Sequence, residues 1–225
     1  FLTANFLMKF SAVADKEYQK ALDEPDKTSS GDRYFRPNQI ENNQEVEFIV
    51  LDEDPLEYWQ VFGEHISDGT KKPFRFPLVG EAPSDEDILK ELGGEYRRTK
   101  VQYDNDKLGL KANISDSPAT HCYVWPIWNL EAKCVQIFEV SQPSIFKQIK
   151  KETGLKKYRK GIGLSSDFSC TLHKVKEGFT KYTFNIIDRD DDLDTDSIEK
   201  EWDTVVENGF DVTLLVAGLD PFNPE

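Results

Sequence analysis

The stretch from residue 121 to residue 182 constrains the fold most, because strand patterns flank a helix pattern on both sides. Strands are typically rich in β-branched and aromatic residues and bounded by Asn, Gly and Asp. Four runs fit this description: 122–128, 134–140, 168–174 and 181–187. The turn-like NLEAK segment joins the first two runs, and Glu177-Gly178 separates the last two. The stretch therefore predicts two β-hairpins.

A short helix is predicted between the hairpins. It begins at Gln142-Pro143-Ser144, where Pro suits a first helical turn, and it ends at Gly154. Shorter strand patterns lie upstream, at 46–51 and 57–62. A helix inserted among many short strands predicts a five-stranded barrel or a strongly bent sheet. Another β-rich α+β fold is the alternative, because periodicity does not separate the two.

Three regions are expected along the chain. Residues 1–32 form an amphipathic helix followed by the linker DEPDKTSSGD, residues 33–187 form the core, and residues 188–225 form an acidic segment. A helix over residues 197–206 and a last strand or ordered extension over 212–217 are expected in the acidic segment. The N-terminal helix either associates with a neighbouring copy or packs on its own core.

Charge is distributed unevenly. The net charge is −14, and residues 188–225, with 13 acidic and 2 basic residues, account for −11 of it. This balance disfavours a dedicated binder of duplex DNA but is compatible with a locally basic groove. Residues 147–160 hold seven basic residues and one acidic residue. Ordinary solvation of a helix face is the favoured interpretation of that run.

Neither a membrane span nor a secretion signal is expected. No run approaches the roughly 20 apolar residues that a membrane span requires, and the N-terminus lacks a signal-peptide pattern. Three cysteines without framework spacing suit a reducing compartment.

Two segments of the stretch resemble the core of bacteriophage single-stranded-DNA-binding proteins with an OB fold. They are VWPIWNLEAKCVQIFEVSQPSIFKQI and DFSCTLHKVKEGFTKYTF. The matching positions are Ile127-Trp128-Asn129, Lys133-Cys134-Val135-Gln136-Ile137, Glu139, Ser144-Ile145, Asp167-Phe168 and Gly178-Phe179-Thr180-Lys181-Tyr182. A Y-F-x-P pattern from Tyr34 to Phe48 and the N-terminal helix are similar too, so the resemblance covers most of residues 1–187.

The resemblance implies a fold class and a function. The fold would be a β-rich α+β, OB-like five-stranded barrel with added strands, an inserted helix, an N-terminal amphipathic helix and an acidic C-terminal helix or extension. The function would be sequence-independent binding of single-stranded DNA during phage replication, recombination or repair, in the cytoplasm of the infected bacterium. Replication or recombination proteins would be partners of the acidic segment. Many relatives carry a Cys/His zinc site, but this chain lacks CxxC there, so zinc is not expected.

Such binding requires aromatic faces for bases and cations for phosphates. The aromatic candidates are Trp59, Phe62, Phe74, Tyr96, Tyr123, Trp125, Trp128 and Tyr182. The basic candidates are Lys71, Lys72, Arg75, Arg97, Arg98, Lys100 and Lys133. Alternation along 122–128 places Tyr123 and Trp125 on one face and Trp128 on the other, so only one set can line a groove while the other is core.

Other functions have weaker support. Six acidic residues have the ligand spacing of a calcium-binding EF-hand loop: Asp188, Asp190, Asp192, Asp194, Asp196 and Glu199. However, Leu193 stands where that loop needs Gly, and a solvated acidic loop is favoured. His121, Cys122, Cys134, Cys170 and His173 could bring metal ligands together, but buried thiols are favoured.

No enzyme activity and no cofactor are expected, because the chain has no P-loop, GxSxG, HExxH or CxxC motif. The main alternative is a protein-interaction module that has the same fold and binds no DNA. A calcium-binding protein or a metal-dependent nuclease that uses the Asp-rich segment is less favoured.

Overall fold

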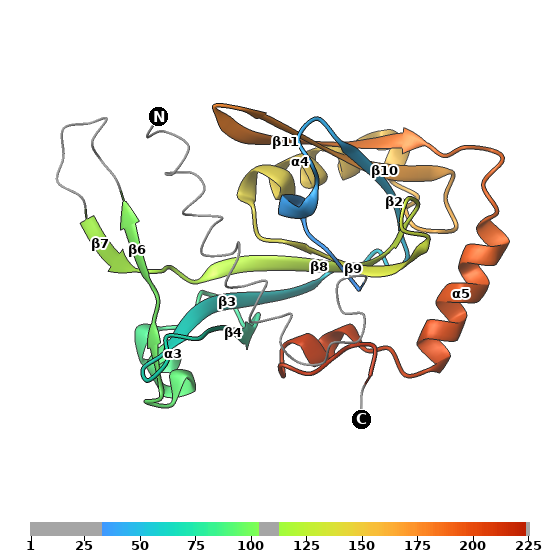
Figure 1. The fold of residues 1–225 in the computed structure, drawn as a ribbon. Helices are drawn as coiled ribbons and strands as arrows, with labels where there is room; N and C mark the ends of the chain where they lie inside the picture. The colour runs from blue at the N-terminus through green and yellow to red at the C-terminus, as the bar shows by residue number, and fades with distance from the viewer. Residues whose placement is uncertain (1–32, 104–112, 224–225) are drawn as a thin grey trace. The chain divides into compact units, whose positions relative to one another are not determined.

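The computed structural model describes residues 33–103 and 113–223, which form a mixed α+β, strand-rich protein with three α-helices among those residues (Figure 1). The chain divides into two compact units. The first unit runs from Tyr58 to His121, and the second combines residues 33–57 with residues 122–223. The chain leaves the second unit within β3 (Leu56–His65) and returns to it within β8 (Thr120–Asn129). The sequence patterns did not anticipate this insertion.

The second unit is built on one curved sheet. Its strands follow the order β1-β9-β8-β2-β10-β11, and this path does not close into a barrel among the described residues. Besides β8, the strands are β1 (Tyr34–Phe35), β2 (Glu45–Val50), β9 (Cys134–Val140), β10 (Phe168–Glu177) and β11 (Phe179–Asp188). The β1–β9 pair is parallel and the other pairs along the path are antiparallel.

Both predicted hairpins are confirmed, and each turn has a local cause. In the β8–β9 turn, Asn129 Oδ1 accepts hydrogen bonds from the amides of Glu131 and Ala132 at 3.0 and 3.1 Å. Lys133 then takes a φ of 54° before β9 begins. Between β10 and β11, Gly178 has a φ of 78°, a conformation that glycine adopts without steric cost.

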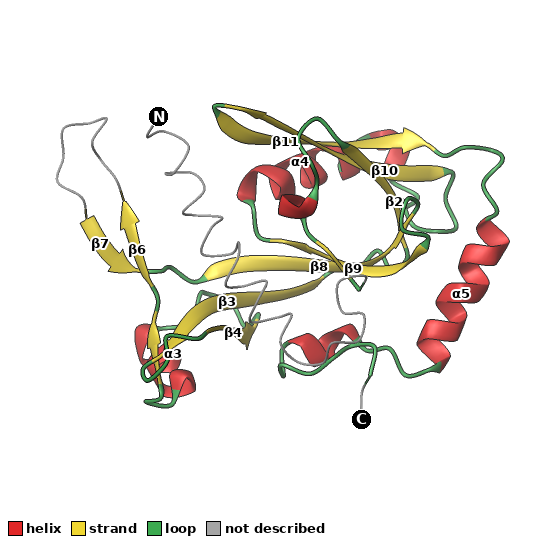
Figure 2. Cartoon of the chain, in the orientation of Figure 1, coloured by secondary structure: helices red, strands yellow, loops and turns green. Residues whose placement is uncertain are grey.

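The helix α4 (Pro143–Thr153) follows β9, as the sequence predicted, and lies within the curve of the sheet (Figure 2). Ile145 and Ile149 are buried from the helix side. They join a core that includes Phe48 of β2, Phe138 of β9 and Leu172 of β10. Burial of one apolar stripe of a helix against a sheet supplies most of the stability of such a helix.

The acidic C-terminal segment is folded. Asp194 caps the helix α5 (Thr195–Glu207) by accepting a hydrogen bond from the Ser197 amide at 3.1 Å. Trp202 of this helix meets the Phe210 ring edge-on at a centroid distance of 5.3 Å. The 3₁₀ helix η5 (Val212–Leu215) comes next. Of the two structures expected for residues 212–217, the chain therefore forms an ordered extension and no strand.

The first unit is a small sheet covered by a helix. Its strands are β3, β4 (Lys71–Pro77), β5 (Tyr96–Arg98), and the separate pair β6 (Lys100–Tyr103) and β7 (Asn113–Asp116). The helix α3 (Asp85–Leu92) begins with a capping box: Ser84 Oγ accepts from the Asp87 amide at 3.1 Å, and Asp87 Oδ2 accepts from the Ser84 amide at 3.2 Å. The helix ends at Gly93, which has a φ of 66°.

The expected N-terminal helix and linker, residues 1–32, lie outside the described residues. None of the helices in the described part of the chain combines the length and apolarity that a membrane crossing requires.

Candidate nucleic-acid interface

The strands β3, β4 and β5 carry most of the proposed binding residues, and their pairing sorts these residues onto two faces. In antiparallel strands, residues directly opposite each other point to the same face. Phe62 lies opposite Pro73, Gln60 lies opposite Arg75, and Glu64 lies opposite both Lys71 and Arg97. These residues therefore share one face of the sheet, called here the Phe62 face.

The opposite face is packed beneath α3. Val61 and Phe74 are buried there with Ile88 and Leu92 of the helix, and Tyr96 packs against them. Gly63 is required at this contact, because a Cβ atom would lie 2.4 Å from the Phe74 ring. This packing takes Phe74 and Tyr96 away from base stacking.

Two predicted cations also belong to the α3 face. The ammonium of Lys72 lies 4.8 Å from the Phe74 ring centre and 4.2 Å from that of Tyr96. Arg98 donates to Asp85 Oδ1 at the start of α3 and to the Ser117 carbonyl, both at 2.6 Å. Arg98 is therefore engaged within the unit, whereas Lys72 lies over two rings with its side chain exposed.

Trp59 shares the α3 side of β3, and its ring lies tilted against that of His121 at a centroid distance of 4.8 Å. Its indole Nε1 is buried and has no hydrogen-bond partner among residues 33–103 and 113–223. His121 therefore packs against the Trp59 indole.

The Phe62 face combines one aromatic ring with three basic side chains. Phe62, Lys71 and Arg75 are half-buried there, and Arg97 is exposed. The Arg75 guanidinium lies 5.6 Å from the ring centre of Tyr58, which is fully buried. One aromatic ring and three cations on one face can stack a base and neutralise its flanking phosphates.

Two basic side chains of the first unit, Arg97 and Lys100, are paired with carboxylates. Arg97 donates to Glu64 Oε1 at 2.6 Å, while its side chain remains 65% exposed. Lys100 pairs with Asp116 across β6 and β7. A phosphate that binds Arg97 must therefore compete with Glu64, which weakens the contact but leaves the guanidinium accessible.

In the second unit, alternation along β8 assigns two aromatics to the core. Trp125 is 8% exposed and packs against Phe138 at 6.1 Å between ring centres. Tyr123 stacks on Phe146 of α4 at 3.7 Å. Burial, and secondarily the charge of Glu57, raises the pKa of the Tyr123 hydroxyl. We therefore exclude Trp125 and Tyr123 from the candidate interface.

The remaining predicted residues of this unit are dispersed. Trp128 is half-buried on the other face of β8, opposite Val135 and Ile49. Lys133 is exposed at the β8–β9 turn, and Tyr182 packs against the core from β11. The structure does not bring these three side chains together.

Sequence reasoning did not select Phe179, which is 59% exposed at the tip of the β10–β11 hairpin. Lys181 is exposed two positions further along the same face, and Lys176 is exposed on the opposite face. An aromatic residue directly after the turn glycine Gly178 was the available signal. Phe179 shares its face with Lys181, but Glu177 lies directly opposite it in the hairpin, so the ring has one lysine and one carboxylate as its neighbours there.

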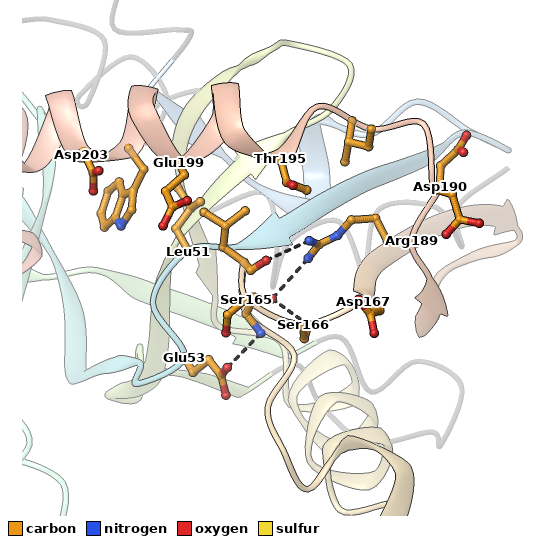
Figure 3. A pocket seen from close by; sticks show the side chains of 15 residues that line it. Leu51, Glu53, Ser165, Ser166, Asp167, Arg189, Asp190, Thr195, Glu199 and Asp203 are labelled. Atoms are coloured by element: carbon orange, nitrogen blue, oxygen red, sulfur yellow. Dashed lines mark hydrogen bonds between the residues drawn. The ribbon is translucent and has the colours of Figure 1, made fainter.

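The second unit contains a cavity of about 640 Å³, shown in Figure 3. Six carboxylate residues contribute to its lining: Glu53, Asp167, Asp190, Asp191, Glu199 and Asp203. The one cation among its described lining residues is Arg189, which donates to the carbonyls of Leu164, Gly163 and Phe168 at 2.9, 3.2 and 2.7 Å. Because the carboxylates repel phosphate and Arg189 is committed to the loop, this cavity is no part of the nucleic-acid interface.

The Asp-rich segment serves local structure. Asp188 ends β11, and Asp194 caps α5 through the Ser197 amide and hydroxyl. Those two hydrogen bonds lower the pKa of the Asp194 carboxyl. Within the described residues, no group of three or more His, Cys, Asp or Glu side chains is placed to hold a metal ion.

The cysteines also have the surroundings of structural residues. Cys122 and Cys170 are buried, Cys134 is half-buried, and all three are free thiols. Burial raises the pKa of the Cys170 thiol to about 12. These are the properties of packing residues.

Comparison of the chain with protein-family models, with curated proteins and with solved structures found no match. The functional proposal therefore depends on the placement of side chains and on the motifs quoted above.

Proposed function

We propose that this chain binds single-stranded DNA without sequence choice and catalyses no reaction. One observation carries the proposal: Phe62 lies on the same sheet face as Lys71, Arg75 and Arg97. Stacking is tolerant of base identity, because every base has a π face, and lysine and arginine contact any phosphate. The choice of DNA over RNA as the ligand follows from the resemblance to the phage proteins.

An OB-like barrel is part of this proposal. The path β9-β8-β2-β10-β11 is antiparallel throughout, and α4 connects its β9 end to β10. Five antiparallel strands with a helix after the third are what an OB-like barrel uses. A pairing of β11 with the part of β9 outside Ile137 and Phe138, where β1 pairs, would complete the barrel.

The cellular setting follows from the resemblance. The protein would coat exposed strands during phage replication, recombination or repair in the cytoplasm of the infected bacterium. Its acidic C-terminal segment would contact replication or recombination proteins, and its N-terminal residues would mediate contacts between neighbouring copies.

A protein-interaction module that binds no DNA is the second candidate. The net charge of −14 and the pairing of Arg97 with Glu64 and of Arg98 with Asp85 favour it. In that case these ion pairs would be permanent, and the Phe62 face would meet a protein.

Binding of a fluorescent oligothymidine, followed by anisotropy, separates the two candidates. The binding protein should prefer the single strand to a duplex of the same length, and its affinity should fall steeply as salt rises. Absence of oligothymidine binding at low salt would refute the proposal. An oligouridine of the same length tests the preference for DNA.

A further inference from the structure

A strongly basic surface lies on α4 and on the 3₁₀ helix η4 (Lys156–Tyr158), in the second unit. All of its basic side chains are exposed: Lys147, Lys150, Lys151, Lys156, Lys157, Arg159 and Lys160. We call these seven residues the α4–η4 cationic surface. Its single acidic neighbour within residues 147–160 is Glu152, in a chain whose net charge is −14.

The helix arranges three of these lysines in one stripe. Lys147, Lys150 and Lys151 stand at positions i, i+3 and i+4, which are neighbours on a helix surface. Ile145 and Ile149 point the other way, into the core. The lysine stripe is therefore the outward face of α4. Neighbouring Cβ atoms in such a stripe are about 5–6 Å apart.

Both helical segments are fixed firmly to the sheet. Gln148 Nε2 donates to the Tyr182 carbonyl, and Gln148 Oε1 accepts from the Phe184 amide, each at 3.0 Å. The buried hydroxyl of Tyr158 donates to the Ile186 carbonyl at 2.9 Å. The cationic side chains thus project from a rigid base, which reduces the entropy lost when they bind.

These cations have few carboxylate partners. Within the described residues, the one ion pair of the surface joins Lys151 and Glu152 at 3.9 Å. In the first unit, by contrast, Arg97, Arg98 and Lys100 each pair with a carboxylate. A phosphate that meets the α4–η4 cationic surface would have to displace only one weak partner.

We infer that the α4–η4 cationic surface binds the phosphates of a single strand, as a contact region separate from the Phe62 face. The inference rests on the proposed function. Like charges at i and i+4 destabilise a helix, and a polyanion would relieve that repulsion. The one aromatic residue of the run, Tyr158, is buried, so the surface contacts phosphates and stacks no base. Its contribution should therefore depend on salt and not on base identity.

Charge removal tests the inference. The variant carries Lys147→Gln, Lys150→Gln, Lys151→Gln and Lys156→Gln, all at exposed positions. The control carries Lys90→Gln and Lys200→Gln, which are exposed on α3 and α5. Affinity for a 30-nucleotide oligothymidine is measured between 50 and 300 mM salt. Each lost phosphate contact should reduce the slope of log K against log salt by about 0.7, so four lost contacts reduce it by about 3.

The outcomes are distinguishable. A wild-type protein that binds no oligothymidine refutes the proposed function. Tight wild-type binding with an unchanged slope in the fourfold variant overturns the inference and leaves the proposed function standing. If the slope is unchanged but self-association is lost in sedimentation, the surface binds an acidic protein segment instead, which also overturns the inference. Circular dichroism verifies that the variant is folded.

A second measurement uses the wild-type protein. Lysine acetylation is quantified by mass spectrometry with and without saturating oligothymidine. Lys147, Lys150, Lys151 and Lys156 should be protected by the strand, while Lys90 and Lys200 should react equally in both samples. Equal acetylation of the α4–η4 lysines in both samples would contradict the inference.

Discussion

Glu53 Oε1 accepts a hydrogen bond from the amide of Gly163 at 2.9 Å, joining two loops that lie 110 positions apart. The contact leaves no room for a side chain. A Cβ atom on Gly163 would lie 2.8 Å from Glu53 Oε1, and one on Gly161 would lie 2.3 Å from it. Gly161 also has a φ of 101°, which side chains rarely adopt.

Gly163→Ala should lower the free energy of unfolding by about 1 kcal/mol, because Glu53 must move and its hydrogen bond is lost. Adding Glu53→Ala should cost little more, since the clash and the bond are then both absent. Urea denaturation of the two single variants and the double variant measures this coupling. Additive losses would show that the Glu53–Gly163 contact is not the cause.

Gly161→Ala should cost about 1–2 kcal/mol more than Gly163→Ala, because the backbone is left-handed there. Glu53→Ala should not recover the stability that Gly161→Ala loses through this backbone strain. Urea denaturation of Gly161→Ala with and without Glu53→Ala separates backbone strain from the clash. Full restoration by Glu53→Ala would contradict the role of φ.

Neighbouring lysines on β4 should differ in their effect on DNA binding. Lys71→Gln should weaken oligothymidine binding and reduce the salt slope by about 0.7, since Lys71 lies on the Phe62 face. Lys72→Gln is the matched control, because the Lys72 ammonium lies over Phe74 and Tyr96. Anisotropy titrations at several salt concentrations make the comparison. A larger loss in Lys72→Gln would place the interface on the α3 face.

Phe62→Ala should weaken oligothymidine binding by about 1–3 kcal/mol if one base stacks on this ring. Phe62→Tyr should bind nearly as well as the wild type, because the ring is kept. The two variants are compared by anisotropy at constant salt. A large loss in both variants, with intact folding, would indicate that Phe62 supports the sheet and stacks no base.

Trp125→Ala should act on stability. Removal of an indole from the core costs about 3–5 kcal/mol, and Trp125 lies against Phe138 there. Below the midpoint of its urea transition, the variant should bind oligothymidine with unchanged salt dependence. A stable variant with weakened binding would show that Trp125 contacts DNA.

The Cys170 thiol should make stability depend on alkaline pH. Burial raises its pKa from 9.0 to about 12, so the folded thiol stays neutral where the unfolded thiol ionises. The stabilisation is thus present below pH 9 and is lost as the pH rises from 9 toward 12. Between pH 8 and 10.5 the wild type should lose about 1–2 kcal/mol more than Cys170→Ala, as measured by urea denaturation. Equal losses would contradict burial as the cause.

Local features of the chain were predictable from the sequence alone. The β8–β9 and β10–β11 hairpins, the limits of α4 and the Ser84 cap of α3 depend on side chains within a few residues of each other. Turn residues, capping residues and short-range periodicity therefore determine them. The family resemblance of the quoted motifs is likewise a property of the sequence alone.

The tertiary structure decided which side chains are available. Alternation along a strand separates Lys71 from Lys72, and Arg97 from Arg98, but it does not say which set faces outward. That choice depends on α3 packing over Phe74 and on α4 packing over Tyr123, contacts between residues distant in sequence. Contacts between residues distant in sequence also place Trp125 in the core. They join Glu53 to Gly163, which no sequence pattern connects with it.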